Sequence, residues 1–169
     1  MKLHKLPART KNGFHVVVES PRGSRVKLEY DPKLGVFVAG RPLPLGYTYP
    51  YDWGFIPGTK APDGDPYDAL VYWDVPSTTG TVLPCRLIGV LELEQREHGE
   101  EFRNDRIIAV PLKHHRSDHV RSVKELSKRV RDDLCNFFTS SVYSSSKETK
   151  VVGWGGPKAA EALIDGSES

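Results

Sequence analysis

The chain has 169 residues and a net charge of +2, from 24 Lys and Arg against 22 Asp and Glu. Its 38% hydrophobic and 27% charged residues are typical of a globular protein and exclude a disordered chain. No stretch approaches the roughly 20 apolar residues that span a bilayer, and two cysteines are too few for a disulfide framework. We therefore expect one cytoplasmic domain over residues 1–169, with an ordered core of about 14–164 and no membrane partner.

The first two thirds of the chain predict β-strands. Residues 25–30 alternate between apolar and polar side chains, which places Lys27 and Glu29 together on the face opposite the apolar residues. Residues 82–94 are long enough for a strand that bends at Gly89. The expected strands are 14–19, 25–30, 36–38, 67–73, 82–94 and 106–110.

Helices are expected in the last third. Ser122 and Glu125 fit a capping box, and apolar residues follow at helical spacing as far as Phe138. A second, short helix is expected over 157–164, with Pro157 in its first turn. Many strands followed by helices predict a mainly β fold, with a small closed or twisted sheet and two C-terminal helices packed outside it.

The segment Asp63-Gly64-Asp65-Pro66-Tyr67-Asp68 carries three carboxylates within six positions. Carboxylates so close together repel one another, and a bound divalent cation removes that cost. Their oxygen atoms suit Mg²⁺, with Mn²⁺ as a possible substitute, better than zinc. The alternative is a solvated Asp-Gly turn beside a strand, and the spacing alone leaves both interpretations open.

Three further charged residues are candidates for the same site. Lys27 and Glu29 form either part of that site or an exposed ion pair, which contributes about 0–1 kcal/mol. Arg41 follows Gly40, and its guanidinium can hold two phosphate oxygens, although a lone loop arginine is usually solvated.

The aromatic segment 46–57 permits three interpretations. Its tyrosines can line a polar site, its rings can stack on nucleic-acid bases, or the whole segment can pack in the core. The net charge of +2 is weak support for a polyanionic partner, and the basic residues of the expected helix after Ser122 fit a solvated face. We therefore expect no nucleic-acid partner.

Taken together, these segments resemble the family I inorganic pyrophosphatases. The signature of that family is D-[SGN]-D-P-x-D, which residues 63–68 match, and the resemblance covers roughly residues 14–164. The other matching segments, in the same order, are 16–19, 27–30, Arg41, 49–57, 85–91, 108–111, 137–138 and 152–154.

This resemblance implies a five-stranded OB-like β-barrel with helices outside it. It also implies Mg²⁺-dependent hydrolysis of pyrophosphate to two phosphates, and a homo-oligomer, commonly a hexamer in bacteria. Asp65 would be the general base as well as a metal ligand. The resemblance further implies metal ligands at Asp63, Asp65 and Asp68, supporting carboxylates at Glu19 and Glu29, and phosphate binders at Lys27 and Arg41.

The chain departs from the family pattern at several positions. Trp53 stands at a substrate-binding position where the family has a tyrosine, and an indole cannot accept a hydrogen bond. The family pattern D-x-K reads Asn104-Asp105-Arg106, in which Arg106 can still bind phosphate but Asn104 carries no charge. Asp105 is one position off and would face the other way on a strand. For an earlier family aspartate, Glu94 is the nearest carboxylate and Glu97 the second choice.

A phosphate-binding Tyr-Lys pair is also missing. The stretch after Phe138 reads Ser140-Ser141-Val142-Tyr143, so Lys147 or Lys150 would have to replace the family lysine.

Three functions therefore remain open. Retention of the three aspartates with Lys27 and Arg41 favours a metal-dependent pyrophosphatase. The lost acidic and Tyr-Lys residues favour either a diverged member with weak or altered phosphoanhydride activity, or a non-enzymatic module that binds phosphate.

Overall fold

The computed structural model describes residues 2–140 and 147–167. Ser141, Val142 and Tyr143, expected in place of the family Tyr-Lys pair, lie outside the described residues. The strands are β1 Arg9–Thr10, β2 Gly13–Ser20, β3 Val26–Asp31, β4 Val36–Pro42, β5 Asp52–Phe55, β6 Asp68–Val71, β7 Val82–Glu97, β8 Glu100–Arg103, β9 Arg106–Pro111 and β10 Glu148–Gly155. The helices are η1 Leu3–Lys5, η2 His115–Ser117, η3 Val123–Glu125, α1 Lys128–Thr139 and α2 Pro157–Asp165.

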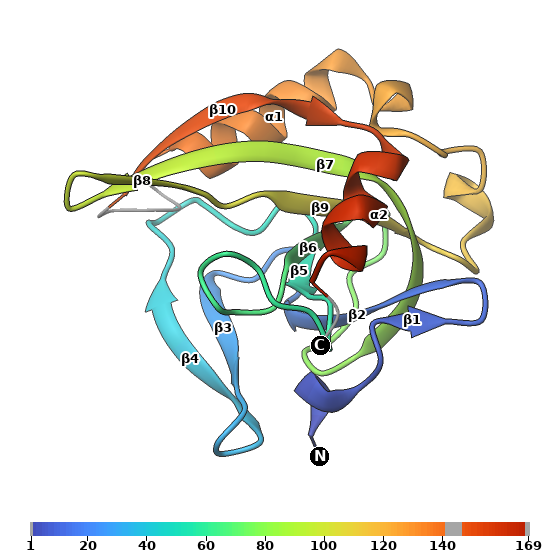
Figure 1. The fold of residues 1–169 in the computed structure, drawn as a ribbon, viewed down its shortest axis with the longest axis horizontal. Coiled ribbons are helices and arrows are strands. Elements are labelled where there is room, and N and C mark those ends of the chain that lie inside the picture. The colour runs from blue at the N-terminus through green and yellow to red at the C-terminus, as the bar shows by residue number, and fades with distance from the viewer. Residues whose placement is uncertain (1, 141–146, 168–169) are drawn as a thin grey trace.

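Five strands close into a barrel, as the family resemblance implied. Hydrogen bonds run in the order β2–β5–β6–β9–β7, and β7 pairs with β2 to complete the ring (Figure 1). All these pairings are antiparallel except β6 with β9, which is parallel. The ring gives the OB-like barrel implied by the resemblance, and closure removes the unpaired edges of a small sheet.

Three elements extend this barrel. The far half of β7 continues beyond the ring, where it pairs with β8 and β10. The hairpin of β3 and β4 forms a separate two-stranded sheet that packs beside β2. In Figure 1 this hairpin projects below one end of β7 and β8, so the two extensions border the same region of the molecule.

Apolar clusters attach both long helices to the sheet. Leu134 and Phe138 of α1 pack with Trp53 and Ile108, and Ile164 of α2 packs in a second cluster. Helix α2 follows β10 and crosses the barrel on the outside (Figure 1). The expectation of two C-terminal helices outside a small closed sheet is confirmed.

The start of the first long helix was predicted wrongly. The capping box of Ser122 and Glu125 is present, but it begins the short 3-10 helix η3, which ends before Leu126. Helix α1 begins afterwards, where the side chain of Ser127 accepts a hydrogen bond from the backbone N–H of Val130. Because Leu126 has extended backbone angles, apolar residues at helical spacing are divided between two helices.

Strands β1, β5, β8 and β10 were not predicted. The whole of β5 is buried, and its alternation is hidden because both of its faces are covered. This strand is the centre of the aromatic segment, where Tyr49, Trp53 and Ile56 are also buried. Of the three interpretations offered for that segment, core packing agrees best with the structure.

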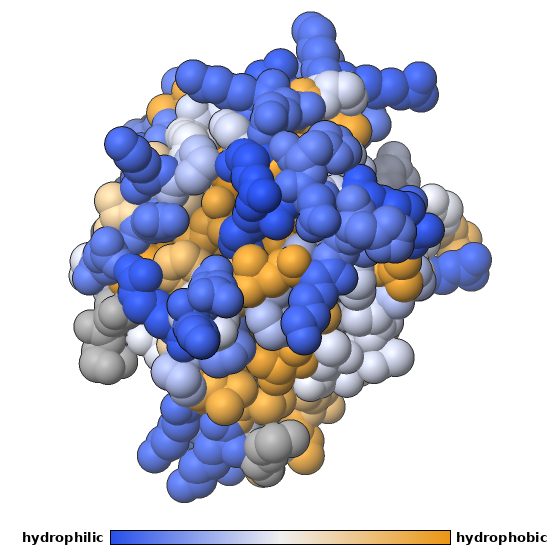
Figure 2. Space-filling model, turned by 90° about the vertical axis from the view of Figure 1, so that its right-hand side faces the viewer, coloured by the Kyte–Doolittle hydropathy of each residue, from blue (hydrophilic) through white to orange (hydrophobic). Residues whose placement is uncertain are grey.

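The face seen in Figure 2 is covered mostly by hydrophilic side chains, with smaller hydrophobic areas between them. Within residues 2–140 and 147–167, no helix has both the length and the apolar character needed to cross a membrane.

Gly89 allows the long strand β7 to bend. The register of β7 against β9 shifts between Leu87 and Gly89, and a Cβ atom at Gly89 would lie 2.5 Å from the backbone oxygen of Gly155. Such a contact forces the backbone to move.

We predict that Gly89→Ala lowers the free energy of unfolding by about 1–3 kcal/mol, as overpacking does elsewhere. Urea unfolding measures the change. Gly156→Ala is the control, because a Cβ atom there has nothing within 4 Å. Equal stability of the two variants would show that the bend does not depend on Gly89.

Candidate active site

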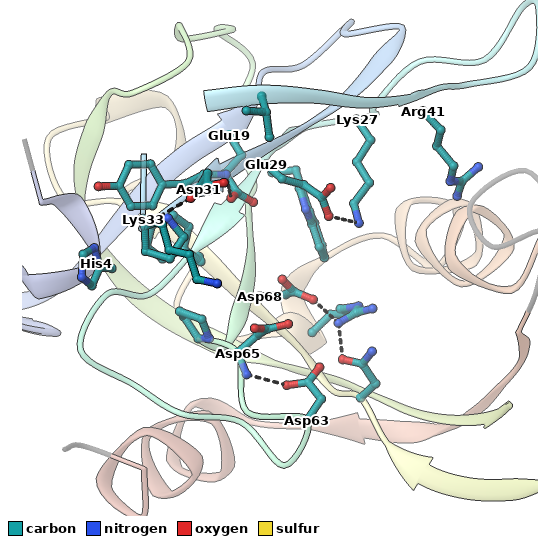
Figure 3. A pocket seen from close by; sticks show the side chains of 18 of the residues that line it. His4, Glu19, Lys27, Glu29, Asp31, Lys33, Arg41, Asp63, Asp65 and Asp68 are labelled. Atoms are coloured by element: carbon teal, nitrogen blue, oxygen red, sulfur yellow. Dashed lines mark hydrogen bonds and ion pairs between the residues drawn. The ribbon is translucent and has the colours of Figure 1, made fainter. Parts of the chain in front are cut away.

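A cavity of about 740 Å³ lies between the barrel and the β3–β4 hairpin. All nine residues that the sequence assigned to a site line this cavity. Figure 3 labels all of them except Trp53 and Arg106. Five lysines and arginines and six carboxylates face it, so the two signs of charge are almost balanced. These eleven residues are Lys27, Lys33, Arg41, Arg106, Lys147, Glu19, Glu29, Asp31, Asp63, Asp65 and Asp68.

The hairpin supplies cations to one side of the cavity. On β3, the Nζ atom of Lys27 lies 2.6 Å from Oε1 of Glu29, so the two residues share a face as the alternation predicted. Arg41 lies on β4, not in the loop that was expected. Figure 3 shows Lys27 and Arg41 pointing into the cavity from the same side, opposite Asp63 and Asp65.

The aspartate segment is a turn that leads into β6. Gly64 has a φ angle of +93°, a conformation that favours glycine, and its N–H donates to the carbonyl of Ala61. The backbone N–H of Asp65 donates to Oδ1 of Asp63 at 3.1 Å. Asp63 and Asp65 are exposed at the rim of the cavity, and Asp68, the first residue of β6, lies deeper.

Arg106 lies beside Asp68 because β6 and β9 are parallel. Ala69 is paired with Ile107, so the first residues of both strands lie next to each other. The Nη1 atom of Arg106 donates to Oδ2 of Asp68 and to Oδ1 of Asn104. The arginine side chain is only 3% exposed, whereas that of Asp68 is 30% exposed and reaches the cavity.

Gln95, not Glu94, faces the cavity from β7. Gln95 shares its strand face with the buried residues Leu91 and Leu93, and its Oε1 accepts a hydrogen bond from Nδ2 of Asn104 at 2.8 Å. Glu94 is on the other face, where it pairs in register with Arg103. The choice of Glu94 as the nearest carboxylate is therefore wrong, because strand alternation turns it away from the cavity.

Asp105 and Glu97 do not line the cavity either. Asp105 accepts from the N–H of Leu93 at 3.0 Å and forms an ion pair with Arg103, so it faces away from the cavity as predicted. The carboxylate of Glu97 lies 3.4 Å from Nζ of Lys147. Lys147 lines the cavity and Lys150 does not, which makes Lys147 the better placed of the two candidate lysines.

Trp53 forms part of the cavity wall but is almost completely buried. Its ring stacks on Tyr49 and packs against Phe138, with centroid distances of 6.3 and 5.4 Å. The guanidinium of Arg106 lies 5.3 Å from the centre of the indole, within the range of a cation–π contact. Trp53 therefore supports the position of Arg106.

The cavity raises the pKa values of two carboxyl groups. Burial raises the pKa of Glu19 to about 8, although the N–H of Tyr30 donates to its Oε1 at 2.8 Å and lowers that pKa. Burial also raises the pKa of Asp68, and the positive charge of Arg106 opposes the effect. Nearby carboxylates raise both pKa values further, so these groups favour additional positive charge in the cavity.

The donor atoms in this cavity fit Mg²⁺ or Mn²⁺ by their chemistry, because the carboxylates offer only oxygen. In the part of the chain that the structure describes, no three His, Cys, Asp or Glu side chains already form a cluster that could hold a metal ion.

Comparison with known proteins identifies the family. The sequence model of the inorganic pyrophosphatase family matches residues 16–169. An inorganic pyrophosphatase from Synechocystis sp. is 37% identical over 166 residues, which cover 98% of this chain and 96% of that protein. One from Thermus thermophilus is 38% identical over 149 residues, covering 86% of this chain and 83% of the relative.

Solved structures agree with the sequence comparison. The inorganic pyrophosphatase of Thermus thermophilus superposes with a TM-score of 0.88 at 35% identity, over 98% of this chain and 95% of that chain. The Helicobacter pylori enzyme gives a TM-score of 0.85 at 32% identity, over 96% of both chains. This chain belongs to the inorganic pyrophosphatase family, and its barrel is the fold of that family.

Several residues of the cavity were not expected from the sequence. Gln95 was missed, although residues 91, 93 and 95 share one face of a strand, and the apolar Leu91 and Leu93 could have indicated that Gln95 also points inward. His4 and Lys33 also line the cavity, from the 3-10 helix η1 and the turn between β3 and β4. Nothing local in the sequence indicates that these distant segments meet.

The raised pKa of Glu19 predicts how stability depends on pH in metal-free protein. The folded state has a pKa of about 8 and the ordinary value is 4.5, so the folded chain binds more protons between these values. The stabilising contribution is complete below about pH 4.5 and is lost as the pH rises through about 8.

We expect Glu19→Gln to flatten this decline, because a glutamine stays neutral and still accepts from Tyr30. The free energy of unfolding should be measured with urea, in the presence of a chelator, at several pH values. The same slope in wild type and variant would contradict the prediction.

Proposed function

We propose that the chain, as a single domain over residues 1–169, hydrolyses pyrophosphate to two phosphates with Mg²⁺. The observation that carries this proposal is the meeting of the 63–68 aspartate turn with Lys27, Arg41 and Arg106 in one cavity. Membership of the inorganic pyrophosphatase family supports it. Carboxylate oxygens are suitable ligands for Mg²⁺. The lysine and arginine side chains would bind the phosphate groups of the substrate, which would also contact the Mg²⁺ ion.

In this proposal the carboxylates have two tasks. Asp63, Asp65 and Asp68 hold Mg²⁺, with Glu19 and Glu29 as supporting carboxylates. When bound, Mg²⁺ lowers the pKa of the attacking water and neutralises charge on the phosphates. Asp65, exposed at the rim of the cavity, accepts the proton of that water as general base. Mn²⁺ is expected to substitute, because it prefers the same oxygen ligands.

The basic residues bind the substrate. Lys27 and Arg41 approach from the hairpin, and Arg106 from the start of β9, so pyrophosphate would be held between two elements of the fold. Arginine forks can bind two phosphate oxygens at once. In the transition state these cations stabilise the charge that develops on the leaving phosphate.

Two finer expectations are proposed with this function: a cytoplasmic location and a homo-oligomer, with a hexamer as the bacterial form. Leu34 and Val36 at the tip of the β3–β4 hairpin are exposed in the single chain, which supports self-association.

The proposed function predicts release of phosphate from pyrophosphate by the purified chain, with a requirement for Mg²⁺. Phosphate should be measured over a wide range of Mg²⁺ concentrations, with Mn²⁺ and a chelator in parallel. A folded protein that releases no phosphate at any Mg²⁺ concentration would exclude the proposal and favour a module that only binds phosphate.

A further prediction concerns Asp65. We expect Asp65→Asn to lower kcat at least about 10²-fold, because it removes a general base and a metal ligand together. The control is Asp118→Asn, a neutralised carboxylate that does not line the cavity. Turnover of the Asp65 variant close to that of the wild type would remove Asp65 from this role.

A further inference from the structure

Arg106 is the most deeply buried cation of the cavity. Its side chain is 3% exposed, compared with 31% for Lys27 and 33% for Lys147. The rings of Trp53 and Phe138 lie against the guanidinium, at 5.3 and 5.8 Å from its carbon to the ring centres. A buried charge of this kind needs a partner of opposite sign and fixed geometry.

Asp68 is that partner, and a line of amides holds the arrangement in place. Arg106 donates to Asp68 and to Oδ1 of Asn104. Asn104 in turn donates from Nδ2 to Oε1 of Gln95 at 2.8 Å, and Gln95 donates from Nε2 to Oγ1 of Thr149 at 3.2 Å. Each amide therefore has its nitrogen directed away from the guanidinium, so Asn104 presents its oxygen to Arg106.

The backbone reinforces this placement. Asp68 and Arg106 are the first residues of β6 and β9, and the parallel pairing of Ala69 with Ile107 sets them side by side. The pair is thus fixed by the barrel as well as by side-chain contacts.

This pairing affects how Asp68 can serve a metal ion. Its Oδ2 atom already accepts from a guanidinium, so a divalent cation approaching the same carboxylate would meet a fixed positive charge. Two like charges a few ångströms apart repel strongly where water is partly excluded. The near balance of basic and acidic residues in the cavity has the same effect on any further cation.

We propose that Arg106 is a permanent cation of the cavity. Its guanidinium occupies one side of the Asp68 carboxylate and there takes over part of the charge neutralisation that a divalent metal ion would otherwise provide. In the free protein it weakens metal binding, and when substrate is present its charge attracts the pyrophosphate anion. The inference rests on the proposed function for the identity of that anion.

The test measures metal and anion separately in Arg106→Gln. Binding of Mn²⁺ without substrate is followed by electron paramagnetic resonance of the free ion. Binding of imidodiphosphate, a pyrophosphate analogue that resists hydrolysis, is followed by calorimetry in the presence of a chelator. We expect Mn²⁺ to bind about tenfold more tightly and imidodiphosphate about tenfold more weakly. A merely distorted cavity would weaken both.

Arg96→Gln is the matched control. Arg96 lies on β7 next to Gln95, is 56% exposed, pairs with Glu101 at 3.4 Å and does not line the cavity. Arg96→Gln removes the same charge but outside the cavity, so the affinities for Mn²⁺ and imidodiphosphate should both stay within about twofold of wild type. Unchanged or weaker Mn²⁺ binding in Arg106→Gln, or equal tightening in Arg96→Gln, would overturn the inference.

If circular dichroism shows that Arg106→Gln is unfolded, Arg106→Lys replaces it in the test. Lysine keeps the charge, so the affinities for both Mn²⁺ and imidodiphosphate should stay within about twofold of wild type. Tenfold tighter Mn²⁺ binding in this variant would overturn the inference. Failure of the proposed function would be seen separately, as wild-type protein that does not hydrolyse pyrophosphate. In that case Arg106→Gln is still expected to bind Mn²⁺ more tightly and imidodiphosphate more weakly.

Discussion

Repulsion between carboxylates that share one cavity is the constraint on which the site depends. Six of them face the cavity, and burial raises the pKa values of Glu19 and Asp68 because neither group is fully solvated. Positive charge must therefore lie among them. The fold supplies it in two ways, from partly exposed lysine side chains and from the buried guanidinium of Arg106.

The barrel topology brings these charges together. The aspartate turn leads into β6, the neighbouring parallel strand β9 begins with Arg106, and the β3–β4 hairpin carries Lys27 and Arg41 on the opposite side (Figure 3). Helix α1 also supports the site, because its Phe138 packs on Trp53 and both rings contact Arg106. The hydrophobic core and the polar site therefore share residues, and a change in one affects the other.

The chain has the family fold, and amide side chains take part in its cavity. At the positions that face the cavity from β7 and from the segment between β8 and β9, it has two amides, Gln95 and Asn104, joined by a hydrogen bond. An amide can orient a guanidinium but carries no charge for a metal. These residues therefore favour a site in which protein cations do more of the charge neutralisation, and metal ions less.

The sequence by itself determined the carboxylate turn and the shared face of Lys27 and Glu29, because each depends on residues close together along the chain. It also determined the family, because many short segments match in the same order. It also predicted that Asp105 faces away, although this residue lies between β8 and β9 and not on a strand. It did not find β5, because a strand buried on both faces has no alternation to detect. Only the tertiary structure decided that Gln95 replaces Glu94 at the cavity and that Asp68 pairs with Arg106. These contacts depend on the register of distant strands, and a shift of one residue would turn each side chain to the opposite face.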